Sequence, residues 1–314
     1  MKFLPFMAPL AALFGYLFAD WMVALDDVIV PLLMIIMLCM GLTLTPRAFL
    51  RLGGCKGAFL TGMILQFSVM PLAALGIATL FRLSPELTVG LVMVGSVAGG
   101  TSSNVWTFLA RGNVALSVAM TSTSTLAGVV MTPLLLQWLV GASVEVPVLE
   151  MLSSLFRIVL VPVVLGVAIN TLASRYVHKL MPALAPLAVF AILLILAIIV
   201  ALNVDKLHEV ALTLVAATLL HNVTGLVTGY YVARALGFET RICRTVAIEV
   251  GMQNSGLATV LALKFFSPVA ALPGALFSAW LNITGSVYAA SCTRADTVGA
   301  AAAAKETESG GNRG

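Results

Sequence analysis

The segment AIEVGMQNSGLATVLA at residues 247–262 decides the fold of this chain. Long apolar stretches flank it, yet its centre carries the carboxylate of Glu249, followed by polar residues and glycines. Irregular polar backbone at membrane depth is tolerated only where it lines a cavity or is buried in protein. The segment therefore predicts a helical membrane protein with a broken helix and a polar site inside the bilayer.

A second stretch, GGTSSNV at 99–105, has the same character in the first half of the chain. It precedes VGMQNSG at 250–256 by about half the chain length, and an apolar segment with an X-Pro step follows each. These steps are Thr132-Pro133 and Leu272-Pro273. The similarity between the halves predicts a fold built from an internal repeat.

The composition requires a membrane environment. Of 314 residues, 61% are hydrophobic and 10% are charged, whereas soluble domains carry about 25% charged residues. Soluble enzymes and nucleic-acid-binding proteins are thereby excluded. At roughly 20 apolar residues per span, the chain supplies about ten spans, near residues 3–19, 28–46, 57–81, 87–111, 113–140, 149–173, 182–203, 207–235, 240–265 and 269–292.

The repeat and the span count together predict the topology. Five spans per half is an odd number, so the two halves must enter the membrane in opposite orientations, as in many inverted-repeat transporters. We expect one transmembrane domain over residues 1–293, with repeat one at about 1–143 and repeat two at about 144–293. Residues 294–314 are polar and rich in small residues, which predicts a disordered cytoplasmic tail.

The charges predict the orientation, because cytoplasmic loops collect Lys and Arg. One side of the predicted topology holds most of the 17 basic residues: Lys2, Arg47, Arg51, Lys56, Arg111, Arg175, Lys179, Arg234, Arg241, Arg244, Arg294, Lys305 and Arg313. The other side holds Arg82, Arg157, Lys206 and Lys264. We expect a multi-pass protein of the inner (plasma) membrane with both termini in the cytoplasm.

Glu249 is the candidate for chemistry. The other acidic residues can be placed in loops, at span ends or in the tail, whereas Glu249 lies within the ninth span. Ionisable groups inside the membrane are costly and mark ion or proton paths by default. The alternative is a structural pair with a buried Arg or Lys, but we place no basic residue at that depth.

Oxygen-bearing side chains surround this carboxylate in the sequence. Gln253 and Asn254 follow it, and Ser102, Ser103 and Asn104 occupy the matching position of the first half. Carboxylate, amide, hydroxyl and carbonyl oxygens suit a small hard cation. Glycines favour local unwinding at both places: Gly99, Gly100, Gly251 and Gly256. Tight helix packing explains any one of these residues, but not two clusters in equivalent positions.

Other polar residues of the spans carry weaker signals. Ser117 and Thr121 are four apart and share a helix face. Gln66 is an isolated amide in the third span, for which a structural interhelical hydrogen bond is at least as good an interpretation as ion binding. The pair His221-Asn222 could line a cavity or relay protons, but we favour a packing role.

Three segments resemble the bile acid:sodium symporter family in its bacterial form, homologues of the apical sodium-dependent bile acid transporter: 99–126, 247–262 and 273–286. The resemblance covers essentially residues 1–293. It implies two inverted five-helix repeats, with a core domain of spans 3–5 and 8–10 and a panel domain of spans 1, 2, 6 and 7. The fourth and ninth helices would be broken and would cross.

The resemblance also implies two sodium sites behind the crossing. One would be formed by Ser103, Asn104, Ser117, Thr121 and Glu249. The other would be formed by Gln66, Glu249 and Gln253 with the carbonyls of Val250 and Met252. Every one of these side chains is of the type that the family pattern has.

The transported molecule is expected between core and panel, beside the breaks. Half-helices that start after a break present free N–H groups and a positive dipole end, which suit a carboxylate or sulfonate. Thr101, Asn254 and Asn282 are the candidate contacts. The resemblance implies an organic anion: a bile acid, or a smaller carboxylate such as pantoate.

The expected function is therefore sodium-coupled symport by alternating access, with no nucleic-acid partner and a monomeric chain in the lipid bilayer. The alternative within the class is proton-coupled transport through Glu249. An intramembrane enzyme would need a second catalytic group, and no HExxH, GxGD or paired acidic motif is present in the spans. A passive channel would need a continuous polar path, whereas these polar residues cluster at one depth.

Overall fold

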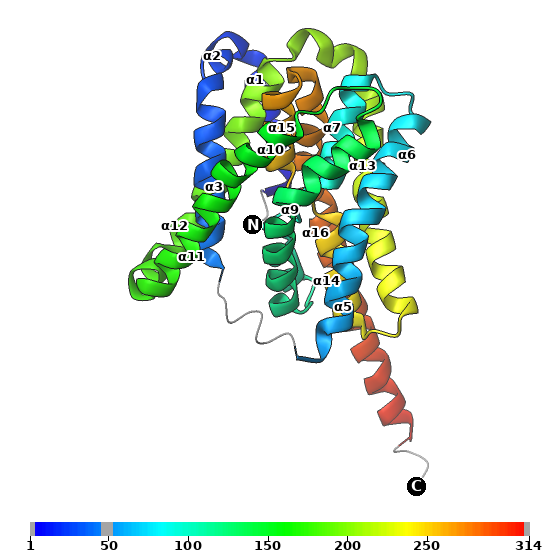
Figure 1. The fold of residues 1–314 in the computed structure, drawn as a ribbon. Coiled ribbons are helices and arrows are strands. Elements are labelled where there is room, and N and C mark those ends of the chain that lie inside the picture. Colours follow the sequence, from blue (N-terminus) through cyan, green and yellow to red (C-terminus); the bar gives the residue numbers. More distant parts are fainter. Residues whose placement is uncertain (1–3, 45–52, 311–314) are drawn as a thin grey trace.

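The computed structural model describes residues 4–44 and 53–310, and every regular element in them is helical (Figure 1). In chain order the elements are α1 (Leu4–Leu17), α2 (Ala19–Val23), η1 (Asp26–Val28), α3 (Ile29–Thr43), η2 (Gly53–Cys55), α5 (Lys56–Ile64), η3 (Leu65–Val69), α6 (Met70–Leu80), α7 (Pro85–Ser96), α8 (Ser102–Leu109), α9 (Val114–Val140), α10 (Val148–Leu155), η4 (Phe156–Leu160), α11 (Val161–Leu172), α12 (Ser174–Ala201), α13 (Val204–Ala235), α14 (Thr240–Gly251), α15 (Ser255–Phe265) and α16 (Pro268–Gly310).

Several of these helices can cross a membrane. Five stretches of the described chain are long and apolar enough: Asp26–Thr43, Lys56–Leu80, Val114–Val140, Val148–Leu172 and Leu212–Ala235. The pair Ser174–Leu184 and Pro186–Ala201, which meet at 45°, counts as a sixth if taken as one span. The protein is thus an all-helical polytopic membrane protein.

Two predicted spans are interrupted where the sequence indicated. The span at 87–111 consists of α7 and α8, and the span at 240–265 consists of α14 and α15. The two interruptions touch, because Gly99 and Gln253 form an isolated antiparallel β-bridge. The breaks predicted from the glycine-bearing polar stretches are therefore present, and they meet inside the molecule.

Two long helices contain a widened π-helical turn, and in each a proline explains it. The turn η3 ends just before Met70-Pro71, and η4 ends just before Val161-Pro162. A proline has no N–H to donate and its ring clashes with the carbonyl four residues earlier. The helix relieves this by a local π turn, a feature that is frequent at functional sites.

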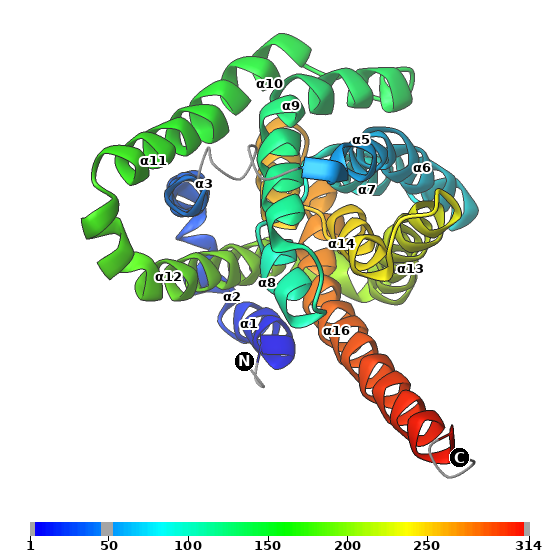
Figure 2. The same ribbon diagram turned by 90° about the horizontal axis from the view of Figure 1, so that it is seen from below.

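The helices form two groups. On one side α3 packs against α11 and α12, and on the other α13 packs against α14 and α6 (Figure 2). Helix α9 lies between the groups (Figure 2). A large apolar core, which includes Leu33, Leu91 and Phe277, joins elements of both groups.

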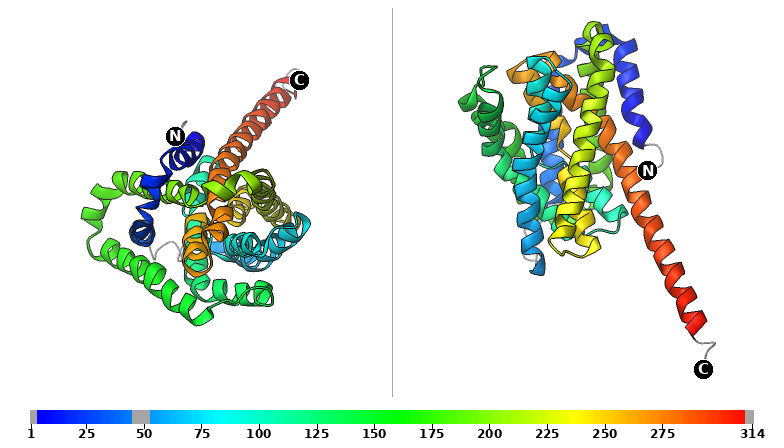
Figure 3. Two further views of the ribbon diagram at one scale, coloured as in Figure 1. Left: turned by 90° about the horizontal axis from the view of Figure 1, so that it is seen from above. Right: turned by 90° about the vertical axis from the view of Figure 1, so that its right-hand side faces the viewer.

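The last helix extends further than the sequence indicated. We expected disorder from residue 294, whereas α16 continues to Gly310 and projects away from the other helices (Figures 1 and 3). A run of alanines at 300–304 explains this, because alanine has the highest helix propensity. Of the residues behind the charge prediction, Lys2, Arg47, Arg51 and Arg313 lie outside the described residues, as do the side chains of Lys206 and Lys305.

Candidate functional site

Three hydroxyls converge on the carboxylate of Glu249, which is 2% exposed. Ser103 Oγ donates to Glu249 Oε1 at 2.5 Å, and Thr121 Oγ1 donates to Oε2 at 2.8 Å. Ser117 Oγ is within hydrogen-bonding distance of both Oε1 and the Asn104 side-chain oxygen. We call Ser103, Ser117 and Thr121 the hydroxyl cluster. All five residues that the resemblance assigned to one ion site thus lie together.

Local structure explains the convergence. Ser117 and Thr121 lie one turn apart on α9 and so point the same way. Ser103 and Asn104 belong to the first turn of α8, directly after the break. A β-carbon at Gly99 would lie 3.3 Å from Glu249 Oε2, so the first break passes right against the carboxylate. The break brings one half of the chain to the acidic group of the other half.

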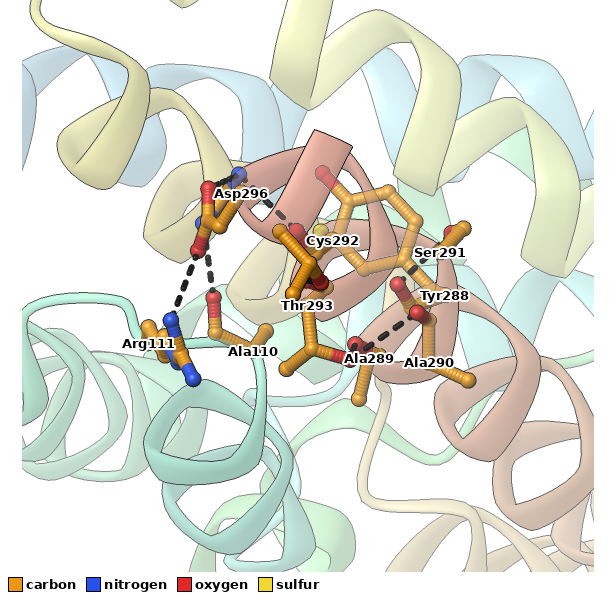
Figure 4. Close-up of polar contacts among 11 residues, drawn as sticks. Ala110, Arg111, Tyr288, Ala289, Ala290, Ser291, Cys292, Thr293 and Asp296 are labelled. Atoms are coloured by element: carbon orange, nitrogen blue, oxygen red, sulfur yellow. Dashed lines mark hydrogen bonds and ion pairs between the residues drawn. The ribbon is translucent and has the colours of Figure 1, made fainter. Parts of the chain in front are cut away.

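Glu249 has no basic partner in the described part of the chain. The ion pairs found there both involve Asp296, with Arg244 at 2.6 Å and with Arg111 at 3.6 Å (Figure 4). Arg244 lies five residues before Glu249 on α14, but its guanidinium forms a fork with both Asp296 oxygens and also donates to the carbonyls of Ala110 and Cys292. Among the described residues, the structure therefore does not support the alternative in which Glu249 forms a structural ion pair with a buried Arg or Lys.

The second predicted ion site is built from two amides, Gln66 and Gln253, which we call the amide pair. Gln66 Nε2 donates to Gln253 Oε1 at 2.5 Å, and Gln253 Nε2 donates back to Gln66 Oε1 at 3.2 Å. The same nitrogens also donate to the carbonyls of Val97 and Val250, both at 2.7 Å. Gln66 lies in the π turn η3. The sequence could not decide between structure and function for Gln66, but the structure places it at the crossing.

The backbone of the two breaks is held by main-chain bonds between the halves. Gly100 N donates to Met252 O at 2.7 Å, and Asn254 N donates to Ala98 O at 2.9 Å. Unwound residues inside a membrane need such partners, because no water is there to supply them. Of the two carbonyls in the second predicted ion site, Val250 O thus accepts from the amide pair and Met252 O accepts from Gly100 N.

A cavity of about 750 Å³ lies next to the crossing. Its walls come from α1, α3 and α12 on one side and from α8, α15 and α16 on the other, and most of the lining side chains are apolar. None of the described residues that line it is charged. The N-terminal residues of α8 and α15, Ser102 and Ser255, are part of the wall. An anion in this cavity would therefore meet helix N-termini rather than a basic side chain.

All three candidate substrate contacts line this cavity: Thr101, Asn254 and Asn282. Asn254 Oδ1 caps α15 by accepting from Leu257 N at 3.1 Å, so its Nδ2 is the group that could donate to an anion. Asn282 Nδ2 donates to Ser278 O at 2.9 Å. Thr101 precedes α8 and makes no side-chain capping bond. The structure thus brings the three side chains to one cavity, with part of their hydrogen-bonding capacity in use.

Sequence reasoning missed several contacts of the site. Thr132 Oγ1 donates to Ser96 O at 2.9 Å and Ser124 Oγ accepts from Gly99 N at 3.2 Å, so α9 holds the end of α7 and the middle of the first break. Asp296 was assigned to the disordered tail, yet it pairs with Arg244. The Thr/Ser-rich stretch at 121–125 was the available signal for Ser124. No local pattern announced the other contacts, because each joins residues far apart in the chain.

Comparisons with known proteins identify the family of this chain. The sodium bile acid symporter family matches residues 30–210. The chain is 38% identical over 278 residues to the uncharacterized sodium-dependent transporter YocS of Bacillus subtilis, which covers 88% of this chain and 87% of YocS. It is 39% identical over 258 residues to the probable sodium/metabolite cotransporter BASS1, chloroplastic, of Arabidopsis thaliana, which covers 82% of this chain and 64% of BASS1.

A third relative is the probable sodium/metabolite cotransporter BASS2, chloroplastic, of Oryza sativa subsp. japonica, 35% identical over 81% of this chain and 61% of BASS2. The chain therefore spans less than two thirds of these chloroplast proteins but most of YocS. All three names describe transporters or cotransporters, none an enzyme. Together with the match over more than half of its length, these relatives show that the chain belongs to the sodium bile acid symporter family.

Proposed function

We propose that this protein is a sodium-coupled symporter of organic anions. The observation that carries the proposal is the convergence of three hydroxyls from the first half of the chain on the buried carboxylate of Glu249 in the second half, with Asn104 bonded to one of them and lining the cavity. A carboxylate with no basic partner among the described residues, surrounded by neutral oxygens, is chemistry for a hard monovalent cation. Sodium dependence in the name of YocS supports the choice of ion.

Two sodium ions bind in this proposal. The hydroxyl cluster with Asn104 and Glu249 forms the first site. The amide pair, Glu249 and the carbonyls of Val250 and Met252 form the second. Since both sites use Glu249, the two ions share one negative charge and fill interdependently.

The proposed topology has ten spans in two inverted repeats. The separation of α3, α11 and α12 from α6, α13 and α14 supports a division into panel and core (Figure 2). A further observation supports the inverted repeat. Gln66 donates to Val97 O across a sequence separation of 31 residues, and Asn222 donates to Gly251 O across 29. Each half thus uses an amide of one helix to hold a carbonyl at its own break. Both termini are proposed to lie on the cytoplasmic side of the inner membrane.

The cavity supports an amphipathic substrate. A volume of about 750 Å³ with largely apolar walls suits a molecule with a sizeable apolar body and one anionic group, such as a bile acid, better than a small polar carboxylate such as pantoate. The anionic group would meet the N-terminal ends of α8 and α15, with Thr101, Asn254 and Asn282 as contacts.

The lining also indicates the conformation within an alternating-access cycle. Residues at one end of several helices line the cavity: Met7, Leu44, Leu109, Met181 and Thr293. In the proposed topology all of them lie toward the cytoplasm. The cavity therefore opens inward, and transport requires a second conformation that opens it to the other side.

Uptake into proteoliposomes tests the proposal. A labelled bile acid and labelled pantoate are offered with an inward gradient of sodium, lithium, potassium or choline at fixed pH. Sodium should drive uptake with a sigmoidal concentration dependence, because two sites share Glu249. Equal uptake in choline would overturn sodium coupling. A dependence on the pH gradient alone would instead favour the proton-coupled alternative through Glu249.

A further inference from the structure

The dipeptide His221-Asn222 of α13 is a fully buried polar feature outside the two proposed ion sites. Both side chains are 0% exposed. Asn222 Nδ2 donates to Gly251 O at 2.9 Å, and His221 Nε2 bonds to Met70 O at 3.0 Å. A carbonyl only accepts, so the proton of the imidazole is on Nε2. The sequence interpretation favoured packing for these residues, but the contacts join two specific carbonyls next to the amide pair.

The first of these carbonyls belongs to Gly251, the last residue of α14, at the start of the second break. Three consecutive carbonyls have three different donors there: Val250 O accepts from the Gln253 side chain, Gly251 O from Asn222 and Met252 O from Gly100 N. The two outer carbonyls are the proposed sodium ligands. Asn222 touches neither, but it fixes the peptide unit between them.

The second carbonyl lies four residues after Gln66. Met70 is the first residue after the π turn that carries Gln66. His221 thus bonds to the end of that turn, while Asn222 bonds to Gly251, two residues before Gln253.

Helix α13 is pressed closely onto the break. A β-carbon at Gly225 would lie 2.7 Å from Gly251 Cα and 2.8 Å from Val250 O, so only glycine permits this approach. The close contact leaves Asn222 little freedom to release Gly251. It also leaves Asn222 Oδ1 and His221 Nδ1 buried without a hydrogen-bond partner, an arrangement that costs stability and that simple packing does not require.

We propose that Asn222 is a positioning residue of the second sodium site: it holds the Gly251 carbonyl so that the carbonyls on either side face the ion. This inference rests on the proposed function and goes beyond it, because Asn222 is not one of the proposed ion ligands and does not line the cavity. Without its amide, the peptide between Gly251 and Met252 is held, among the described residues, only by the bond from Met252 N to Ile248 O at 2.9 Å. Loss of a group that orients metal ligands typically weakens binding by roughly 10–100-fold.

Sodium titration calorimetry without substrate tests this, on detergent-solubilised full-length protein. Asn222→Ala should weaken one sodium site by roughly 10–100-fold, leave the other unchanged, and lower the Hill coefficient toward one. Asn222→Gln keeps the amide donor and should recover part of the lost affinity. Asn170→Ala is the matched control, since Asn170 is also buried and its Nδ2 donates to a carbonyl, Leu44 O, at 3.0 Å.

The outcomes separate the two proposals. If the wild-type protein does not bind sodium, the proposed function fails. If it binds sodium and Asn222→Ala binds both ions equally well, only the positioning role fails. An equal loss in Asn170→Ala would also overturn it, because the effect would then be general destabilisation. Should Asn222→Ala not fold, Asn222→Gln decides the matter: one weakened site with a lowered Hill coefficient supports the inference, and unchanged affinity at both sites rejects it.

Discussion

The hydroxyl cluster and the amide pair differ in how much must move when a cation binds. Each hydroxyl of Ser103 and Thr121 donates to Glu249, and a rotation about one bond turns a lone pair toward an ion without shifting a heavy atom. In the amide pair, Gln66 and Gln253 bond to each other in both directions. To bind there, an ion must displace the amide nitrogen of one glutamine from the amide oxygen of the other.

The two proposed sites share one carboxylate, yet they differ in how far their side chains must move before an ion can bind. The hydroxyl cluster is preorganised, whereas the amide pair must open before its oxygens reach an ion. We therefore expect the first ion to bind at the hydroxyl cluster. The second ion should then bind at the amide pair, because its proposed site also includes Glu249. The following predictions test this comparison, from the largest expected effect to the smallest.

Glu249→Ala should have the largest effect, because it removes the carboxylate common to both sites. We expect sodium affinity to fall by more than about 100-fold and coupled uptake to disappear. Folding should survive, since removal of an unpaired buried carboxylate does not leave a partner charge behind. Sodium titration and uptake measure these effects. Glu145→Ala, a change at an exposed acidic residue, is the control, and retention of wild-type uptake in Glu249→Ala would refute the assignment.

Ser117→Ala and Gln253→Ala should divide the two sites. Ser117→Ala removes a hydroxyl from the preorganised site, so the first ion should bind roughly 10–100-fold more weakly. Binding of the second ion should then be weakened as well. Gln253→Ala should weaken only the second ion by a similar factor and leave a single tight site. Calorimetric titration distinguishes the two. If Gln253→Ala abolished all tight sodium binding, the amide pair would have to fill first.

Asn282→Ala should leave both proposed ion sites intact and lower the affinity for the organic anion. Sodium and anion affinities are linked reciprocally, with typical coupling of about 5–150-fold. Asn282 lines the cavity and bonds only to Ser278 O, so sodium binding without substrate should be unchanged. Titration of each ligand into Asn282→Ala and Gln253→Ala checks this. A loss of substrate-free sodium affinity in Asn282→Ala equal to that in Gln253→Ala would show that the roles are not divided.

Asp296→Asn should give the smallest effect, confined to stability. Hydrogen bonds from Arg244 lower the pKa of Asp296 below its usual value of 3.8. A carboxyl whose pKa is lower in the folded state stabilises the folded protein at pH values above its unfolded pKa. This stabilisation is lost as the pH falls through the folded pKa. The wild-type protein should thus melt at a higher temperature than Asp296→Asn at pH 7, and the gap should close below about pH 4. A gap that persisted in acid would contradict this.

The sequence predicted the parts of the fold that depend on local patterns. Polar and glycine residues inside apolar runs gave both breaks, and Glu249 stood out as the acidic residue of a span. Asn282 and Thr101 depended on resemblance alone, although both line the cavity. The alanine-rich end of α16 was read by its polarity rather than by its helix propensity, so the contact of Asp296 with Arg244 was missed.

Other features could not be read from the sequence because they are settled by distant neighbours. Gln66 and Gln253 are 187 positions apart, and neither residue alone shows that it will pair with the other. His221 and Asn222 carried an equally ambiguous signal, and their partners, Met70 and Gly251, are apolar residues that contribute only backbone carbonyls.

The bridge between the two breaks has a genetic consequence. A β-carbon at Gly100 would lie 2.8 Å from Gln253 O, so any substitution there pushes the halves apart at the point where their main chains are bonded. Such a substitution misaligns two bonded backbone segments and does not remove a functional side chain. Second-site suppressors of Gly100→Ala should therefore be found in the opposite half of the gene, around codons 252–254, rather than near the original lesion.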